Sequence, residues 1–156
     1  MSLGIVNHIS LRVTDHQKSM QFYDPVMDFL GYEKIAKFGF YRLPDRIGDI
    51  YLSRVPPKER GKKLYDPEAP GLGHLAFNAA SRQQVDDLYK LLQKIGANIL
   101  DKPAEYDYTP GYYAVYFADP DGLKLELAYT PFQLPALHRE LNRMKAKERR
   151  QKAAKK

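Results

Sequence analysis

The sequence contains no cysteine and no tryptophan among its 156 residues. Disulfide-stapled scaffolds, thiolate metal sites and thiol nucleophiles all need cysteine, so the composition excludes these three classes. No apolar run approaches the ~20 residues that a membrane-spanning helix requires, and the N-terminus lacks the pattern of a signal peptide. These absences predict a cytoplasmic protein with no membrane partner. The length of 156 residues suits one domain, or two small repeats with a common core.

Positive charge is concentrated at the C-terminal end. Residues 136–156 include nine basic and two acidic residues, a net charge of +7, whereas the whole chain carries +6. The other residues are therefore close to neutral. The positive net charge comes from the C-terminal tail and does not indicate a basic binding face. No aromatic residue interleaves with the tail's charges, so nucleic acid is not the expected partner.

Two segments that lie 66 residues apart repeat one pattern. Residues 7–13 read NHISLRV and residues 73–79 read GHLAFNA. Both alternate apolar and polar positions, and a period of two predicts a half-buried strand.

A helix is expected after each of these strands. The first opens near Asp15 and the second at Ser81, residue types that cap helix N-termini, and each ends at a glycine, Gly31 or Gly96. Pro25 is expected to kink or split the first helix, because proline lacks the amide donor.

Shorter strand candidates complete two copies of a strand–helix–strand–strand–strand unit. They are 32–37, 38–43 and 49–54 in the first copy and 98–103, 112–118 and 123–130 in the second. The pattern predicts an α+β domain over residues 4–131, with paired βαβββ modules at 4–55 and 72–131 and a linker at 56–71. Asp121-Gly122 marks a tight turn before the last strand.

Strand alternation predicts where the two histidines point. His8 and His74 are at equivalent positions of the repeat, and each falls on the face opposite the apolar side chains of its strand. In the last strand the leucines share one face, which leaves Glu126 on the other. We therefore expect both histidines and Glu126 on the open faces of the strands.

Two imidazoles and one carboxylate form a facial triad that holds a divalent metal ion and leaves coordination positions free. A metal ion held by His8, His74 and Glu126 could bind two neighbouring oxygens of a substrate and polarise a carbonyl group. The alternative interpretation is that the three residues are ordinary polar groups on solvated strand faces.

These segments together resemble the vicinal oxygen chelate superfamily, which includes glyoxalase I, extradiol dioxygenases, and fosfomycin and bleomycin resistance proteins. The segments that resemble it are 7–9, 22–32, 73–77 and 110–126, with Asp119-Pro120-Asp121-Gly122 the most specific. The resemblance implies paired βαβββ modules whose curled, mixed sheet surrounds a metal-binding concavity, and a homodimer is the expected assembly.

Family metal ligands come from the first, fourth, fifth and eighth strands, and His8, His74 and Glu126 match three of them. Aligning Tyr41 with Tyr116 places the fourth-strand position at Tyr51, where the family has Glu or Gln. Because Tyr51 replaces the Glu or Gln of the family, the resemblance implies a three-ligand site, which could hold Fe, Mn, Ni or Zn. Asp49 could substitute if the strand register slips.

The extradiol dioxygenase pattern is only half present. Val115-Tyr116, the Asp-Pro-Asp-Gly turn and Glu126 match it, but residues 107–109, where that pattern has a histidine, are Asp, Tyr and Thr. Because this histidine is missing, an extradiol-type dioxygenase that cleaves aromatic rings is the second expected function. The resemblance implies first a metal-dependent lyase, isomerase or thiol transferase that acts on a small molecule with vicinal oxygens, and alternatively a metal-free sequestering protein of the bleomycin resistance type.

Glu126 is the first candidate for proton transfer, and Tyr116 the second. Tyr51, Tyr113 and Glu105 are candidate substrate-binding residues. The tyrosines between residues 106 and 116 are expected mainly to pack and to line the wall of a pocket.

A last helix is expected in the tail. Leu134, Leu137, Leu141 and Met144 recur at helical spacing after Pro135, a residue that suits a first turn. Residues 132–156 are therefore expected to form a basic C-terminal helix with a frayed end.

Overall fold

The structure, a computed structural model, describes residues 6–44, 48–59, 65–66 and 68–131. In chain order the elements are β1 (His8–Val13), α1 (His16–Phe29), β2 (Glu33–Ala36), β3 (Phe40–Arg42), β4 (Asp49–Arg54), the short 3-10 helix η1 (Pro57–Glu59), β5 (Leu75–Ala79), α2 (Arg82–Lys94), β6 (Asn98–Glu105), β7 (Tyr113–Ala118) and β8 (Lys124–Tyr129). The predicted α+β class and the paired βαβββ order are confirmed.

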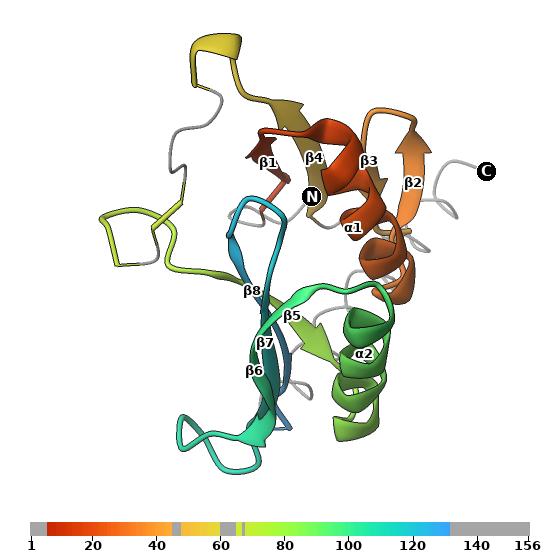
Figure 1. Cartoon of the computed structure of the whole chain (residues 1–156). Helices are drawn as coiled ribbons and strands as arrows, with labels where there is room; N and C mark the ends of the chain where they lie inside the picture. The colour runs from red at the N-terminus through yellow and green to blue at the C-terminus, as the bar shows by residue number, and fades with distance from the viewer. Residues whose placement is uncertain (1–5, 45–47, 60–64, 67, 132–156) are drawn as a thin grey trace, which may run out of the picture.

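Each module forms its own four-stranded mixed sheet. The strand orders are β1-β4-β3-β2 and β5-β8-β7-β6, and the outer strands β1 and β5 pair in parallel with β4 and β8. The remaining neighbours are antiparallel. Figure 1 shows α2 along one face of the second sheet and α1 beside the strands of the first.

Both helices begin and end as their sequence signals predict. The Asp15 carboxylate accepts hydrogen bonds from the amides of Gln17 and Lys18, and the Ser81 hydroxyl accepts one from Gln84. Gly31 and Gly96 follow the last turns with φ of +81° and +67°, a region that glycine enters without a steric penalty.

Pro25 does not split α1, which is one continuous helix. The proline removes a hydrogen bond to the carbonyl of Gln21, four residues earlier. Gln21 lies on the exposed side of the helix, so water can bind that carbonyl. Tyr23, Val26 and Met27 stay buried on the opposite side and hold the helix in place.

The two modules share one hydrophobic core. Buried residues of the first module, including Val13 and Phe22, belong to the same cluster as Leu88 and Phe117 of the second. The Phe22 and Phe117 rings are 6.2 Å apart between centroids. Because neither sheet buries its apolar face alone, each module completes the core of the other.

The Asp-Pro-Asp-Gly turn joins the modules. Asp119 is buried, and its carboxylate accepts hydrogen bonds from the amides of Asp121 and Leu123 within the turn and from the Tyr23 hydroxyl of α1 at 2.8 Å. Asp121 accepts hydrogen bonds from the amide and the hydroxyl of Thr14. One turn therefore anchors the start and the middle of the first helical segment.

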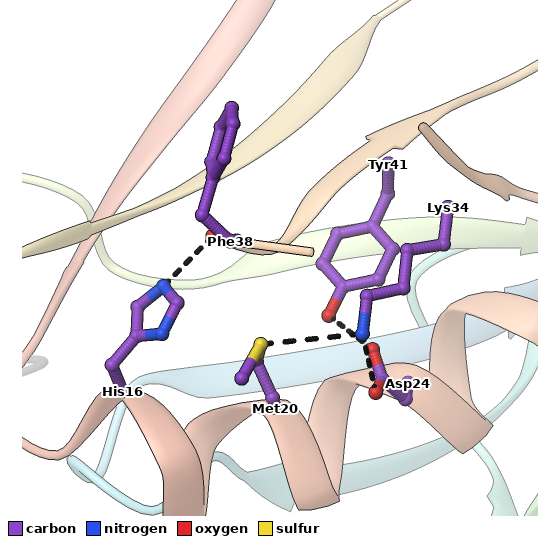
Figure 2. A network of polar contacts seen from close by, with 6 residues as sticks. All are labelled: His16, Met20, Asp24, Lys34, Phe38 and Tyr41. Atoms are coloured by element: carbon purple, nitrogen blue, oxygen red, sulfur yellow. Dashed lines mark hydrogen bonds and ion pairs between the residues drawn. The ribbon is translucent and has the colours of Figure 1, made fainter. Parts of the chain in front are cut away.

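A polar network fixes α1 to the β2–β3 hairpin (Figure 2). Asp24 binds the Lys34 ammonium at 2.7 Å and accepts a hydrogen bond from the Tyr41 hydroxyl at 2.8 Å. Nε2 of His16 lies 2.7 Å from the Phe38 carbonyl oxygen. These contacts orient the first sheet on its helix.

Among the described helices, none is long and apolar enough to span a membrane. The predicted C-terminal helix over residues 132–156 lies outside the described residues.

Candidate metal-binding site

His74 and Glu126 meet at the open edge of the second sheet. His74 directly precedes β5, and the parallel register places Ala76 beside Glu126 of β8. Nε2 of His74 lies 3.0 Å from Oε2 of Glu126; the glutamate side chain is 1% exposed and the histidine 42%. A buried carboxylate is thus joined to solvent through an imidazole.

The other Glu126 oxygen accepts a hydrogen bond from the Tyr112 hydroxyl. Burial, and next the bond to Glu126, raise the pKa of the Tyr112 phenol above its usual value. Tyr112 is therefore protonated at neutral pH and donates the hydrogen bond. Such a donor fixes the orientation of a carboxylate that binds a metal ion.

Tyr116 lies opposite Glu126 in the antiparallel β7–β8 pair. Burial, followed by the Glu126 charge, raises the pKa of the Tyr116 phenol, which keeps its proton at neutral pH. Lys124 Nζ lies over the ring of Tyr116, 4.5 Å from its centroid. Tyr116 thus lies beside Glu126 as a protonated phenol.

The geometry of the pair fits a metal ion. Two donor atoms about 2.1 Å from one ion and about 90° apart are separated by about 3.0 Å, which matches the distance between the His74 nitrogen and the Glu126 oxygen. One imidazole and one carboxylate are also donor types that Fe, Mn, Ni and Zn accept.

His8 does not join this pair within one chain. Its ring packs edge-on against Tyr51 of the first sheet at 5.3 Å, and its Nδ1 is 2.8 Å from the Asn7 side-chain oxygen. In the part of the chain that the structure describes, no three His, Cys, Asp or Glu side chains are grouped closely enough to hold a metal ion. The three predicted ligands are thus divided between the two sheets.

The register shows that Tyr51 is the counterpart of Glu126. Tyr51 pairs with Ser10, two residues after His8, as Glu126 pairs with Ala76, two residues after His74. The alignment of Tyr41 with Tyr116 between the two modules was wrong by one residue. Phe40, and not Tyr41, lies opposite Tyr51, as Tyr116 lies opposite Glu126. The first sheet therefore presents an aromatic ring where the second has a carboxylate.

Asp49 does not replace the missing carboxylate by a register slip. It pairs with His8 in the observed register, and its side chain binds the Arg42 guanidinium, with Nη2 at 3.0 Å from Oδ2. Arg42 also lies over the Phe40 ring at 4.8 Å, and Phe40 stacks on Tyr51 at 4.3 Å. The local sequence pattern does not predict the contact between Arg42 and Asp49, because this contact depends on strand pairing.

Tyr113 and Glu105 lie on the opposite face of the second sheet from Glu126. They pair with each other across β6 and β7, and both contact Arg82 of α2. The Tyr113 hydroxyl donates to Asp86 of the same helix at 2.8 Å. Since successive residues of a strand point to opposite faces, these two predicted substrate-binding residues are separated from the pair by the sheet.

The hydrogen bond from Tyr112 to Glu126 was missed from the sequence, where the tyrosines were interpreted mainly as packing. The alternation of residues 112, 114 and 116 contained the signal, because it places Tyr112 on the face of Tyr116.

The sequence model of the glyoxalase/bleomycin resistance protein/dioxygenase superfamily matches residues 5–127. The chain is 35% identical to Bacillus subtilis YqjT over 129 residues, which cover 78% of this chain and 96% of YqjT. It is 31% identical to the metallothiol transferase FosB of Bacillus licheniformis over 128 residues, 80% of this chain and 74% of FosB.

A solved structure of a glyoxalase candidate from Bacillus halodurans superimposes with a TM-score of 0.70 and 27% identity, covering 82% of this chain and 97% of that one. The observed strand order and the Asp-Pro-Asp-Gly segment of the sequence agree with the family that these comparisons indicate. The chain belongs to the glyoxalase/bleomycin resistance protein/dioxygenase superfamily.

Proposed function

We propose that this protein is a metal-dependent enzyme of the glyoxalase type, a lyase, isomerase or thiol transferase that acts on a small molecule with adjacent oxygens. The observation that supports the proposal is the buried Glu126 carboxylate, 3.0 Å from the half-exposed His74 imidazole. The likeness to a metallothiol transferase favours the same class of site.

His74 and Glu126 are the proposed ligands from one chain, and His8 of a second copy is the proposed third. A homodimer is needed because His8 does not reach the pair within the described chain. When bound, the metal ion supplies Lewis-acid polarisation of a substrate carbonyl. Glu126 is the proposed base; Tyr112 donates a hydrogen bond to one of its oxygens, and Tyr116 lies opposite it on the neighbouring strand.

Metal content tests this proposal. The purified full chain is loaded separately with Fe, Mn, Ni and Zn, and bound metal is measured by elemental analysis. We expect about one ion per chain for the wild type, and loss of the ion in His8→Ala, His74→Ala and Glu126→Gln, because each substitution removes one of three ligands.

Glu105→Gln is the matched control, since it makes the same chemical change on the opposite face of the sheet and is expected to keep the metal. Circular dichroism checks that every variant folds. A wild type that holds no stoichiometric metal under any loading condition, or a His74→Ala variant that keeps its metal, contradicts the proposal.

A metal-free binding protein is the second candidate. Tyr106, Tyr112 and Tyr116 line the Glu126 side of the second sheet, and such a wall suits an apolar ligand without chemistry. Ligand binding that a chelator leaves unchanged would favour this candidate, whereas the enzyme proposal predicts that a chelator weakens binding.

A further inference from the structure

The two histidines of the repeat have different polar partners. Nε2 of His74 lies 3.0 Å from a carboxylate oxygen of Glu126, whereas the first sheet has Tyr51 at the position that matches Glu126. The residue before His74 is a glycine, which has no side chain to offer. The carboxylate of the neighbouring strand thus orients one imidazole of the repeat but not the other.

The carboxylate nearest to His8 in the strand pairing is already engaged. Asp49 pairs with His8, but both of its oxygens lie within hydrogen-bond distance of the Arg42 guanidinium. This ion pair favours the contact with arginine over one with a neutral imidazole. His8 therefore needs a different partner to fix its ring.

Asn7 is that partner. Its side-chain oxygen Oδ1 lies 2.8 Å from Nδ1 of His8. An amide oxygen only accepts hydrogen bonds, so Nδ1 carries the proton and donates it. A neutral imidazole has one proton for its two nitrogens, and Nε2 of His8 therefore keeps a free lone pair.

The strand pairing holds both members of this contact. The Asn7 carbonyl accepts a hydrogen bond from the Asp49 amide at 3.1 Å, which continues the β1–β4 ladder one residue before β1 begins. The Tyr51 ring meets the His8 ring edge-on at 5.3 Å. The imidazole is therefore held at Nδ1 and at its ring, although both Asn7 and His8 are exposed.

A metal ion binds the nitrogen of an imidazole that carries no proton, and a hydrogen bond at the other nitrogen decides which one that is. We propose that Asn7 is a positioning residue that acts through His8. It holds the proton on Nδ1 and leaves Nε2 as the atom that binds the metal ion. The role toward the metal rests on the proposed function, whereas the tautomer of His8 is a property of the metal-free chain.

Nitrogen NMR of the metal-free, full-length protein measures this tautomer. Histidine is isotope-labelled, and spectra are recorded at about pH 8.5, where an ordinary imidazole is neutral. The signal missing from His8→Ala identifies His8. We expect the proton on Nδ1 in the wild type and a shift of the population toward Nε2–H in Asn7→Leu, which removes the acceptor. Asn7→Asp should keep the wild-type tautomer, because its carboxylate also accepts a hydrogen bond.

Competition with a chromophoric chelator then measures the affinity for Zn²⁺. We expect Asn7→Leu to weaken binding by roughly tenfold to a hundredfold, the usual effect of removing the partner of a ligating histidine, and Asn7→Asp to restore it. Asn98→Leu is the matched control, since Asn98 is an exposed asparagine on the outer strand β6 of the other module. This variant should keep both the His8 tautomer and the affinity.

The outcomes separate the inference from the proposed function. A His8 tautomer that is the same in Asn7→Leu as in the wild type overturns the inference, whatever the metal content. A changed tautomer with unchanged affinity for Zn²⁺ also overturns it and leaves the proposed function standing. If the wild type binds none of Fe, Mn, Ni and Zn, the proposed function fails, and the role of Asn7 toward a metal fails with it.

Discussion

Glu126 combines a buried carboxylate with two different partners. One oxygen faces His74 and the other accepts a hydrogen bond from Tyr112, so each oxygen of this buried carboxylate has a protein partner. Burying an ionised carboxylate without such partners is costly. The Tyr112 hydroxyl is therefore expected to stabilise the fold as well as to orient Glu126.

Tyr112→Phe removes this hydroxyl and keeps the ring. We expect the free energy of unfolding to fall by about 1–3 kcal/mol, because one oxygen of a buried carboxylate loses its donor. Urea unfolding followed by circular dichroism measures the change. Tyr113→Phe is the control, since its hydroxyl binds the less buried Asp86 and its loss is expected to cost less. Equal losses in the two variants would contradict this reasoning.

At the scale of the element, the turn between β7 and β8 sets the surroundings of the Asp119 carboxyl. Its buried Asp119 binds two amides of its own turn and the hydroxyl of Tyr23 from the other module. Burial nevertheless outweighs these bonds and raises the pKa of the Asp119 carboxyl above its usual 3.8. The folded state therefore favours protonated Asp119 relative to the unfolded chain.

This direction predicts a pH dependence. The contribution of Asp119 to stability is fully present below its unfolded pKa and is lost as pH rises through its raised folded pKa. The free energy of unfolding of the wild type minus that of Asp119→Asn should therefore fall as the pH rises above about 4, as measured by urea unfolding.

Asp87→Asn is a control of opposite sign. The hydrogen bond from Lys90 lowers the pKa of Asp87, so its contribution is lost as pH falls. A wild-type minus Asp119→Asn difference that rises with pH would show that the hydrogen bonds to Asp119 outweigh its burial.

At the scale of the whole molecule, the two sheets share a core but separate the predicted ligands. His8 stands on the edge strand β1 and His74 stands at the edge strand β5. Among the described residues no strand pairs with the outer side of β1 or β5, and Val6 and Leu72, two residues before each histidine, are exposed apolar side chains. These features favour the proposed assembly with a second copy.

Mixing two variants that are each expected to lose the metal tests whether the site spans two chains. His8→Ala and His74→Ala are unfolded together, refolded and loaded with metal. If each site combines His8 of one chain with His74 and Glu126 of the other, random pairing restores about a quarter of the wild-type metal content. If each site lies within one chain, the mixture binds no more metal than the separate variants.

The sequence by itself determined the secondary structure and the βαβββ repeat. Strand alternation, the caps at Asp15 and Ser81 and the glycines after the helices are local, and each acts within a few residues. Alternation also placed Glu126 correctly on the face away from the leucines, and the repeat placed Tyr51 at the matching position.

Only the tertiary structure decided which of these side chains meet. The 3.0 Å pair of His74 and Glu126, the bond between Arg42 and Asp49, and the separation of His8 from the pair depend on strand register and on how the modules pack. Tyr113 and Glu105 lie behind the sheet for the same reason. Contacts between distant segments follow from the shared core, which no local pattern specifies.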